Sequence, residues 1–369
     1  MHIVRVALNR VRRFDSVEFS PRPGINLITG DNGAGKTSIL EALHLMAYAR
    51  SFRGRVRDGL VQKGADGLDV FVEWEEQAAP GGGGGAGVRR RAGLAHNGHS
   101  WRGRLDGEDV SQLGVLCAAL AVVTFEPGSH ALVSGSSESR RRFLDWGLFH
   151  VEPDFLSLWR RYSRALKQRN ALLKSGAGGG MLDPWDHELA ETGTALTSHR
   201  QHYLDRLQER AGQIACEIAP SLELQALELQ PGWRRQEMDL ADALLLARER
   251  DRLAGHTSVG PHRADWNVQF AQIPGREALS RGQAKLTALA CLLAQAGDHA
   301  AERGDWPVIA LDDLASELDR PHQQRVLEHL QRTPAQVFIT ATEPPALLQE
   351  WSSTYTRFHV EHAAIQLLE

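Results

Sequence analysis

The fold is decided by one stretch of the sequence, which reads Ile25-Asn26-Leu27-Ile28-Thr29-Gly30-Asp31-Asn32-Gly33-Ala34-Gly35-Lys36-Thr37-Ser38. An apolar run typical of a strand leads into a glycine-rich turn, and residues 36–48 then place apolar side chains at helical spacing. This strand–loop–helix order is the context in which the pattern G-x-x-x-x-G-K-[ST] predicts a phosphate-binding loop. We therefore predict that a nucleotide binds here.

Each residue type in this loop has its own chemical role. The glycines let backbone N–H groups converge on phosphate oxygens, and the helix that begins near Lys36 adds its positive dipole end. Lys36 is expected to reach the β- and γ-phosphates of ATP, and the Thr37 hydroxyl is expected to ligate Mg²⁺. The predicted nucleotide-contacting residues are Gly30, Asp31, Asn32, Gly33, Ala34, Gly35, Lys36, Thr37 and Ser38.

Composition limits the class of protein. The 369 residues suffice for two domains, and a net charge of −4 means that any nucleic-acid surface is a local patch. The three cysteines form no CxxC pair and are interpreted as buried thiols in a reducing compartment. No apolar run approaches ~18 residues and no signal-peptide pattern is present, so we expect a cytoplasmic protein without a membrane partner.

Strand-like and helix-like patterns occupy different parts of the chain. We predict an ATP-binding α/β lobe from residues 1–135 plus 257–369, and an inserted, mainly helical lobe from residues 136–256. Glycines 81–85 are expected to form a surface loop. The expected strands are 3–8, 17–19, 25–29, 68–74, 88–95, 101–105, 118–125, 266–270, 308–313, 336–340, 358–360 and 365–368. The expected helices are 36–48, 138–149, 152–173, 184–218, 236–253, 280–295 and 321–330.

Two further motifs bear on the nucleotide. The apolar run before Asp312 predicts a buried strand that delivers this aspartate to Mg²⁺, while Asp313 is placed to orient or activate the attacking water. Asp313 and Lys36 are thus the predicted catalytic residues. Ser280-Arg281-Gly282-Gln283 opens another helix with a serine at the N-cap, which predicts a second anion-binding helix end formed by Ser280, Gly282 and Gln283.

The order of these motifs is more specific than any one of them. The chain has a phosphate loop, a long insertion, S-x-G-Q, a strand ending in aspartate, and then S-x-L-D at 316–319. This is the order of motifs in ABC-type ATPases, in which the signature helix of one subunit completes the nucleotide site of another. We predict an ABC-type head with a mixed sheet. Two alternatives remain: a transporter ATPase subunit, which should carry a switch histidine where this chain has Ala341-Thr342-Glu343, and a P-loop small-molecule kinase, which needs no S-x-G-Q.

The segment 138–174 is basic within a mildly acidic chain. It carries nine lysines and arginines against four acidic residues. By charge alone this pattern is more typical of a solvated helical face, and the alternative is a DNA-binding surface. The candidate DNA contacts, including two from the loop after the first helix, are Arg50, Arg53, Arg141, Arg160, Arg161 and Arg164.

Together these motifs resemble those of the RecF family, bacterial DNA replication and repair proteins that are related to SMC heads without their coiled coil. The resemblance covers nearly the full length, and the missing switch histidine agrees with it. It implies a weak, DNA-stimulated ATPase that dimerises on ATP and clamps duplex DNA, single-stranded gaps and junctions. It also implies partners in RecR and RecO, and a role in RecA loading and SOS induction. The supporting segments beyond the phosphate loop are residues 48–53, 141–145, 260–263, 279–283 and 311–319.

Overall fold

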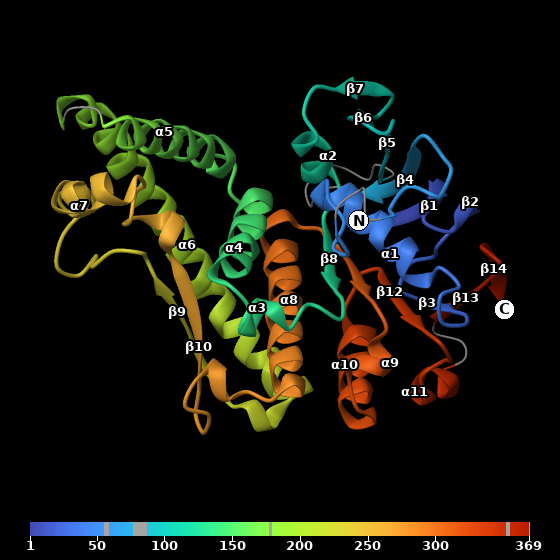
Figure 1. The fold of residues 1–369 in the computed structure, drawn as a ribbon. Helices are drawn as coiled ribbons and strands as arrows, with labels where there is room; N and C mark the ends of the chain where they lie inside the picture. Colours follow the sequence, from blue (N-terminus) through green and yellow to red (C-terminus); the bar gives the residue numbers. More distant parts are fainter. Residues whose placement is uncertain (55–58, 77–86, 177–178, 352–354, 369) are drawn as a thin grey trace. The chain divides into compact units, whose positions relative to one another are not determined.

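The computed structural model describes residues 1–54, 59–76, 87–176, 179–351 and 355–368 (Figure 1). The chain forms two compact units. The first comprises residues 1–129, 217–219 and 289–369, and the second comprises residues 130–216 and 220–288. The glycine run at 81–85, predicted as a surface loop, lies outside the described residues.

The first unit contains an antiparallel sheet. Its strands are β1 His2–Val11, β2 Phe14–Phe19, β4 Leu68–Glu76, β5 Val88–His96, β6 Trp101–Leu105 and β7 Glu108–Val110. They are paired in the order β2-β1-β4-β5-β6-β7. Alternate residues of β4, among them Val70, Val72 and Trp74, are buried, as expected for a sheet with one face on the core. The strands expected at 88–95 and 101–105 are confirmed as β5 and β6, which pair with each other as a hairpin around Asn97-Gly98.

The second sheet of this unit carries the predicted phosphate loop. Its strands are β3 Ile25–Thr29, β8 Val122–Phe125, β11 Val308–Leu311, β12 Val337–Ala341, β13 Tyr355–Glu361 and β14 Ala364–Leu368. The order is β14-β13-β3-β12-β11-β8, and all pairs are parallel except β13 with β14. Every residue of β3 is buried, as expected for a parallel strand covered on both faces. Strands from the end of the chain therefore flank β3 on both sides.

Helix α1 Lys36–Tyr48 joins the two sheets into one core. Its apolar residues Ile39, Leu40 and Leu43 are fully buried in a single cluster with residues from both sheets. Because only the short loop 30–35 separates this helix from β3, its N-terminus lies at the carboxyl edge of the parallel sheet. The other helices with residues in this unit are α2 Gly114–Ala119, the last two residues of α6 Asp183–Ile218, α8 Arg281–Arg303 from residue 289 onward, α9 Leu314–Glu317, α10 Arg320–Arg332 and α11 Ala346–Glu350.

The second unit is built mainly from helices. They are α3 Ala131–Ser134, α4 Ser137–Val151, α5 Phe155–Ser175, α6 Asp183–Ile218 and α7 Leu240–Ala254, with 3-10 turns η2 Gly179–Met181, η3 Pro220–Leu222, η4 Pro261–Arg263 and η5 Arg276–Ala278. Strands β9 Leu224–Gln230 and β10 Asp265–Phe270 form an antiparallel ribbon. A fully buried guanidinium, that of Arg169, pairs with Asp186 and Asp251 and so links α5, α6 and α7.

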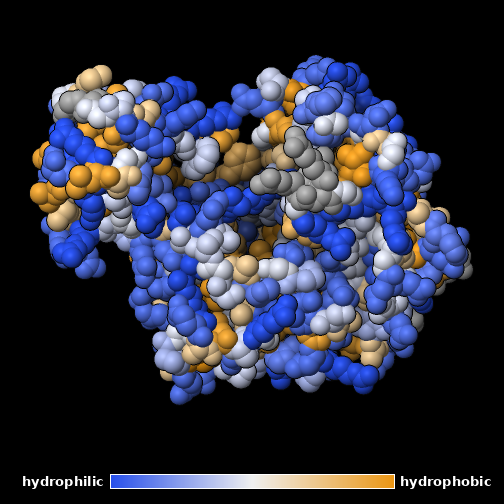
Figure 2. Space-filling view, viewed as in Figure 1, coloured by the Kyte–Doolittle hydropathy of each residue, from blue (hydrophilic) through white to orange (hydrophobic). Residues whose placement is uncertain are grey.

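The surface is mostly hydrophilic in the view of Figure 2. An apolar area lies at the end of the second unit that carries α7, where Leu245, Leu246 and Leu253 are exposed. Within the described ranges, no helix combines the length and the hydropathy needed to cross a lipid bilayer.

Several expectations about these elements are corrected. Strand β9 lies in the region predicted to be almost free of strands; its alternating Leu227 and Leu229 pair with β10. The strand expected at 118–125 begins only at Val122, because the preceding residues form α2. Residues 257–288 group with the second unit, since β10 is paired with β9. Cys216 is exposed rather than buried.

Candidate nucleotide site

The loop between β3 and α1 has a backbone that requires glycine. Gly30 has φ +148°, and a Cβ there would lie 2.3 Å from the carbonyl oxygen of Val360. Gly35 has φ +122°, and a Cβ there would meet the ring of Phe14 at 2.8 Å. Both positions exclude other side chains, so the loop backbone stays uncovered for a ligand.

Lys36 lies across the loop that precedes it. Its ammonium donates to the carbonyl oxygens of Gly30 at 2.7 Å and Asp31 at 2.9 Å. Burial lowers the pKa of Lys36, and the charges of Asp313 and Asp312 oppose this effect. The ammonium is thus fixed at the mouth of the loop, within the cavity described below.

Thr37 and Asp312, the predicted Mg²⁺ ligands, lie side by side in the structure. The Thr37 hydroxyl donates to Asp312 Oδ1 at 2.9 Å, and the Asp312 carboxyl group is almost fully buried at the end of β11. Hydroxyl and carboxylate oxygens are ligands that Mg²⁺ prefers, and adjacent ligands of a Mg²⁺ octahedron lie about 2.9 Å apart. The pair therefore fits a magnesium ion. Burial raises the pKa of Asp312, against hydrogen bonds from Thr340 and Thr37.

Asp313 has an unusual backbone and a partly unsatisfied carboxylate. Its φ is +54°, which is rare for a residue other than glycine. Its N–H donates to the Thr340 hydroxyl at 2.8 Å. Among the described residues, Asp313 Oδ1 is buried without a hydrogen-bond partner. Backbone strain and an unsatisfied carboxylate oxygen are expected of a residue that accepts a proton or orients a water molecule.

Thr340 is a site residue that the sequence analysis missed. Its hydroxyl donates to Asp312 Oδ1 at 2.7 Å and accepts from the Asp313 N–H, so it fixes both acids. The sequence did contain a signal for Thr340, which is a polar residue at the end of the strand expected at 336–340. In the structure this strand, β12, is the parallel neighbour of β11, so Thr340 lies at the same sheet edge as Asp312.

These groups line one cavity of about 390 Å³ in the first unit. Lys36, Thr37, Asp312 and Asp313 all border it, which is the arrangement expected from the sequence. Three arginines also line the cavity: Arg12 and Arg13 from the turn between β1 and β2, and Arg53 from the loop after α1. No role was predicted for Arg12 and Arg13 from the sequence, and Arg53 was predicted only as a DNA contact.

The predicted second anion site is a helix start in the second unit. Ser280 N donates to Gln283 Oε1 at 2.9 Å, and Gln283 N donates to Ser280 Oγ at 3.2 Å. This reciprocal capping box confirms the predicted N-cap of α8. Ser280 and Gly282 are exposed, and a Cβ on Gly282 would meet nothing within 4 Å. The helix end is therefore open to approach from outside.

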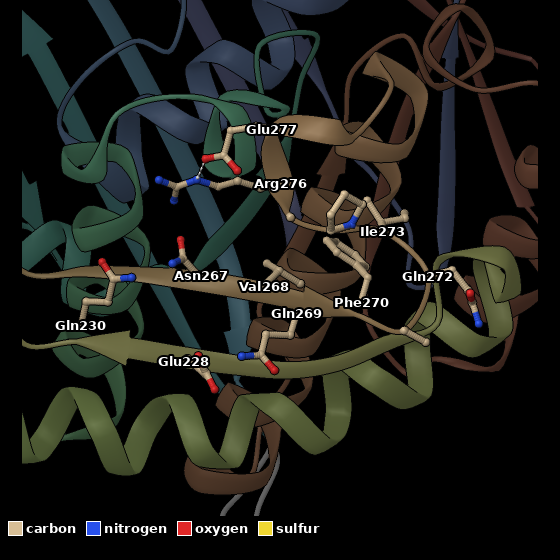
Figure 3. A pocket seen from close by; sticks show the side chains of 13 residues that line it. Glu228, Gln230, Asn267, Val268, Gln269, Phe270, Gln272, Ile273, Arg276 and Glu277 are labelled. Carbon is tan, nitrogen blue, oxygen red and sulfur yellow. Dashed lines mark hydrogen bonds and ion pairs between the residues drawn. The ribbon is translucent and has the colours of Figure 1, made fainter.

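A second hollow, of about 630 Å³, lies wholly within the second unit (Figure 3). Residues of the β9–β10 ribbon, among them Glu228, Val268 and Phe270, line it together with the loop 271–275 and the start of η5, which contributes Glu277. Arg276 Nε donates to Glu277 at 3.1 Å, and its guanidinium also contacts Asp265 at 3.4 Å. An amide-rich lining whose arginine is already paired does not suit a polyphosphate, so the cavity of the first unit remains the candidate nucleotide site.

The candidate DNA contacts differ in their surroundings. Arg160 and Arg164 are exposed on α5. Arg161 is paired with Glu188 and Glu191 of α6, and Arg141 donates to the carbonyl oxygen of Ala264. The Arg50 guanidinium lies 6.0 Å from the ring centre of Tyr48. These side chains remain candidates for DNA contact.

The fold and the site together define the class of protein. The chain combines a mainly parallel sheet that carries a phosphate loop, an aspartate at the end of a nearby strand, an antiparallel sheet and an N-capped signature helix. This combination defines an ABC-type ATPase head of the SMC kind. The family model described as "RecF/RecN/SMC N terminal domain" matches residues 2–366.

Comparison with curated proteins identifies the family within this class. The chain is 73% identical to the DNA replication and repair protein RecF of Stenotrophomonas maltophilia (strain R551-3), over 99% of each chain. It is 36% identical to the protein of that name from Shewanella baltica (strain OS155 / ATCC BAA-1091), over 100% of each. The chain belongs to the RecF family of DNA replication and repair proteins.

Solved structures have the same fold. One described as "Structure of the recombination mediator protein RecF-ATP in RecFOR pathway" is similar with a TM-score of 0.84 at 24% identity, and covers 100% of this chain and 98% of that one. An Smc head bound to the C-winged helix domain of ScpA is similar with a TM-score of 0.59 at 12% identity, over 100% and 97% of the two chains. At these identities the similarity shows the fold.

Proposed function

We propose that the chain is an ATP-dependent DNA clamp of recombinational repair, which binds duplex DNA, single-stranded gaps and junctions. The observation that most supports this proposal is the convergence of Lys36, Thr37 and Asp312 on one cavity. The relatives' name, DNA replication and repair protein, agrees with it, and so does the description of one similar structure as RecF-ATP.

ATP binding uses the groups of this cavity in distinct roles. Loop N–H groups and Lys36 hold the β- and γ-phosphates, while Thr37 and Asp312 hold Mg²⁺, which neutralises phosphate charge. Asp313 orients or deprotonates the attacking water through its unsatisfied carboxylate oxygen. Arg13 and Arg53 add positive charge at the same cavity. We propose slow hydrolysis to ADP and phosphate, because the site is completed only in a dimer.

Dimerisation follows from the exposed signature helix. Ser280 and the N-terminus of α8 bind the γ-phosphate of the nucleotide held by a second copy, so each subunit completes the site of its partner. This contact requires triphosphate, and hydrolysis removes it. ATP binding thus closes the dimer, and hydrolysis opens it.

DNA is held through its phosphates. Exposed arginines of α5, namely Arg160 and Arg164, supply contacts that do not depend on sequence. RecR and RecO are the proposed protein partners, and the proposed outcome is RecA loading on single-stranded gaps, which in turn supports SOS induction.

Light scattering with and without Mg-ATP, repeated with gapped duplex DNA, tests this function. A clamp should change from monomer to dimer with ATP and should bind DNA most tightly in that state. A P-loop kinase would stay monomeric with ATP, and a transporter subunit would dimerise without any response to DNA. Either result would contradict the proposal.

A further inference from the structure

Glu41 is a buried carboxylate to which the nucleotide mechanism assigns no role. It lies on α1, five residues beyond Lys36, and its exposed fraction is 0%. A buried carboxylate is costly unless charged or hydrogen-bonding partners satisfy it. Its partners come from two segments that both border the nucleotide cavity.

The first partner is Arg12, in the turn between β1 and β2. Arg12 Nε donates to Glu41 Oε2 at 2.9 Å and Arg12 NH2 donates to Oε1 at 2.7 Å, which makes a bidentate pair. The next residue, Arg13, donates to the carbonyl oxygen of Gly33 within the phosphate loop. The Glu41–Arg12 pair therefore fixes the turn that presents Arg13 to the cavity.

The second partner is Ser51, in the loop after α1. Its hydroxyl donates to Glu41 Oε1 and accepts the N–H of Arg53 at 2.9 Å. The Arg53 side chain lines the cavity together with Asp312. One hydroxyl thus connects the buried carboxylate to the backbone of a second cavity arginine.

We propose that Glu41 is a positioning residue, which anchors the β1–β2 turn and the loop 50–53 to α1 so that Arg13 and Arg53 face the triphosphate. The inference rests on the proposed nucleotide function and adds a source of ATP affinity beyond the phosphate loop. Arg12, Arg13, Arg53 and Lys36 repel one another, and a buried anion at the shared anchor offsets this repulsion. Arginines that are held in place before binding lose less side-chain entropy when the ligand arrives.

The variants Glu41→Gln and Ser51→Ala separate positioning from a merely structural role. Glu41→Gln keeps the size and removes the charge, and Ser51→Ala cuts only the link to Arg53. ATP and ADP affinities are measured by titration calorimetry with Mg²⁺, beside thermal unfolding. We expect Glu41→Gln to weaken ATP binding about tenfold and Ser51→Ala about threefold. The matched control is Glu18→Gln, because Glu18 pairs with Arg5 on an exposed face and should leave affinity unchanged.

The decisive measurement is a double-mutant cycle in an Arg13→Gln/Arg53→Gln background. If Glu41 acts through these arginines, Glu41→Gln should change ATP affinity by less than about twofold there. An equal loss in both backgrounds, or a lower melting temperature with unchanged ATP affinity, overturns the proposal and leaves the proposed function intact. Wild-type protein that binds no Mg-ATP overturns both. If Glu41→Gln does not fold, a double-mutant cycle of Ser51→Ala with Arg53→Gln tests the proposal instead. Ser51→Ala should then lose its effect on ATP affinity in the Arg53→Gln background, and an equal loss in both backgrounds overturns the proposal.

Discussion

At the scale of single residues, Thr340 controls the two acids of the site. Its hydroxyl donates a hydrogen bond to Asp312 Oδ1 and accepts one from the N–H of Asp313. The orientation of both acids therefore depends on a side chain from another strand. A shift of one of them by even ~1 Å is enough to cost about a hundredfold in rate.

Thr340→Val keeps the shape of the side chain and removes both hydrogen bonds. We expect ATP turnover to fall about ten- to hundredfold, while ATP affinity changes less than about threefold because Lys36 and the loop are intact. Single-turnover hydrolysis and nucleotide titration measure the two effects. Thr342→Val, at an exposed position nearby, is the control. Wild-type turnover in Thr340→Val would show that the hydroxyl does not order the acids.

Asp312→Asn should keep ATP binding measurable and abolish turnover, because the amide is a poor Mg²⁺ ligand. Burial raises the pKa of Asp312, so the folded state binds a proton at this carboxylate more tightly than the unfolded state does. The free energy of unfolding therefore falls as the pH rises from the ordinary aspartate pKa through the raised pKa of the folded state. Without nucleotide, Asp312→Asn should therefore raise the melting temperature at neutral pH, and the gain should vanish below the ordinary aspartate pKa. Hydrolysis at the wild-type rate would refute the metal assignment.

At the scale of elements, local patterns were predictable and long-range partners were not. The bounds of β3 and α1 match the expectation, because burial, glycines and helical spacing all occur within one short stretch. The Ser280 cap was predicted for the same reason. Strand β9 was missed because its short alternation lies between long helices. Arg12 and Arg13 were missed because only the paired strands β1 and β2 bring their turn to the phosphate loop.

The turn of α9, which carries the S-x-L-D motif, is held by one side chain of α10. Gln323 Nε2 donates to the carbonyl oxygens of Ala315 at 3.0 Å and Leu318 at 2.7 Å. Gln323→Leu leaves both carbonyls without this donor, at a cost of about 1–3 kcal/mol in the free energy of unfolding. We expect faster amide hydrogen exchange at 314–319 and weaker ATP-dependent dimerisation, with ATP binding by the monomer retained. Unchanged exchange in this turn would contradict the prediction.

At the scale of the whole molecule, Ser280 is expected to act in another subunit. Ser280→Arg puts a bulky side chain at the exposed start of α8, and should block ATP-induced dimerisation while the monomer still binds ATP. The test mixes Ser280→Arg with Lys36→Ala subunits. A mixed dimer has one site with an intact phosphate loop and an intact signature helix only if the helix acts across the interface. If two folded, inactive mutants recover no hydrolysis on mixing, the arrangement in trans is wrong.

DNA binding by the whole dimer should depend steeply on salt. Each phosphate neutralised by α5 contributes about 0.9 to the slope of log affinity against log salt. Replacing Arg160 and Arg164 by glutamate should therefore flatten the slope by about 2 units per subunit. The matched control reverses the exposed Arg102 and Arg104 of β6. An equal change in both double variants would mean that the α5 arginines are no more than a solvated face.

The position of β3 between β12 and β13 has a consequence for how the protein is made. Ile25 pairs with Val337 and Tyr355, so the nucleotide loop acquires its neighbours only after about 300 further residues have been synthesised. At ribosomal rates of roughly 5–20 residues per second, that delay is about 15–60 s. During this time the buried strand has no sheet to join, and a nascent chain cannot yet bind a nucleotide through it. Competence for nucleotide binding therefore arises only near the end of translation.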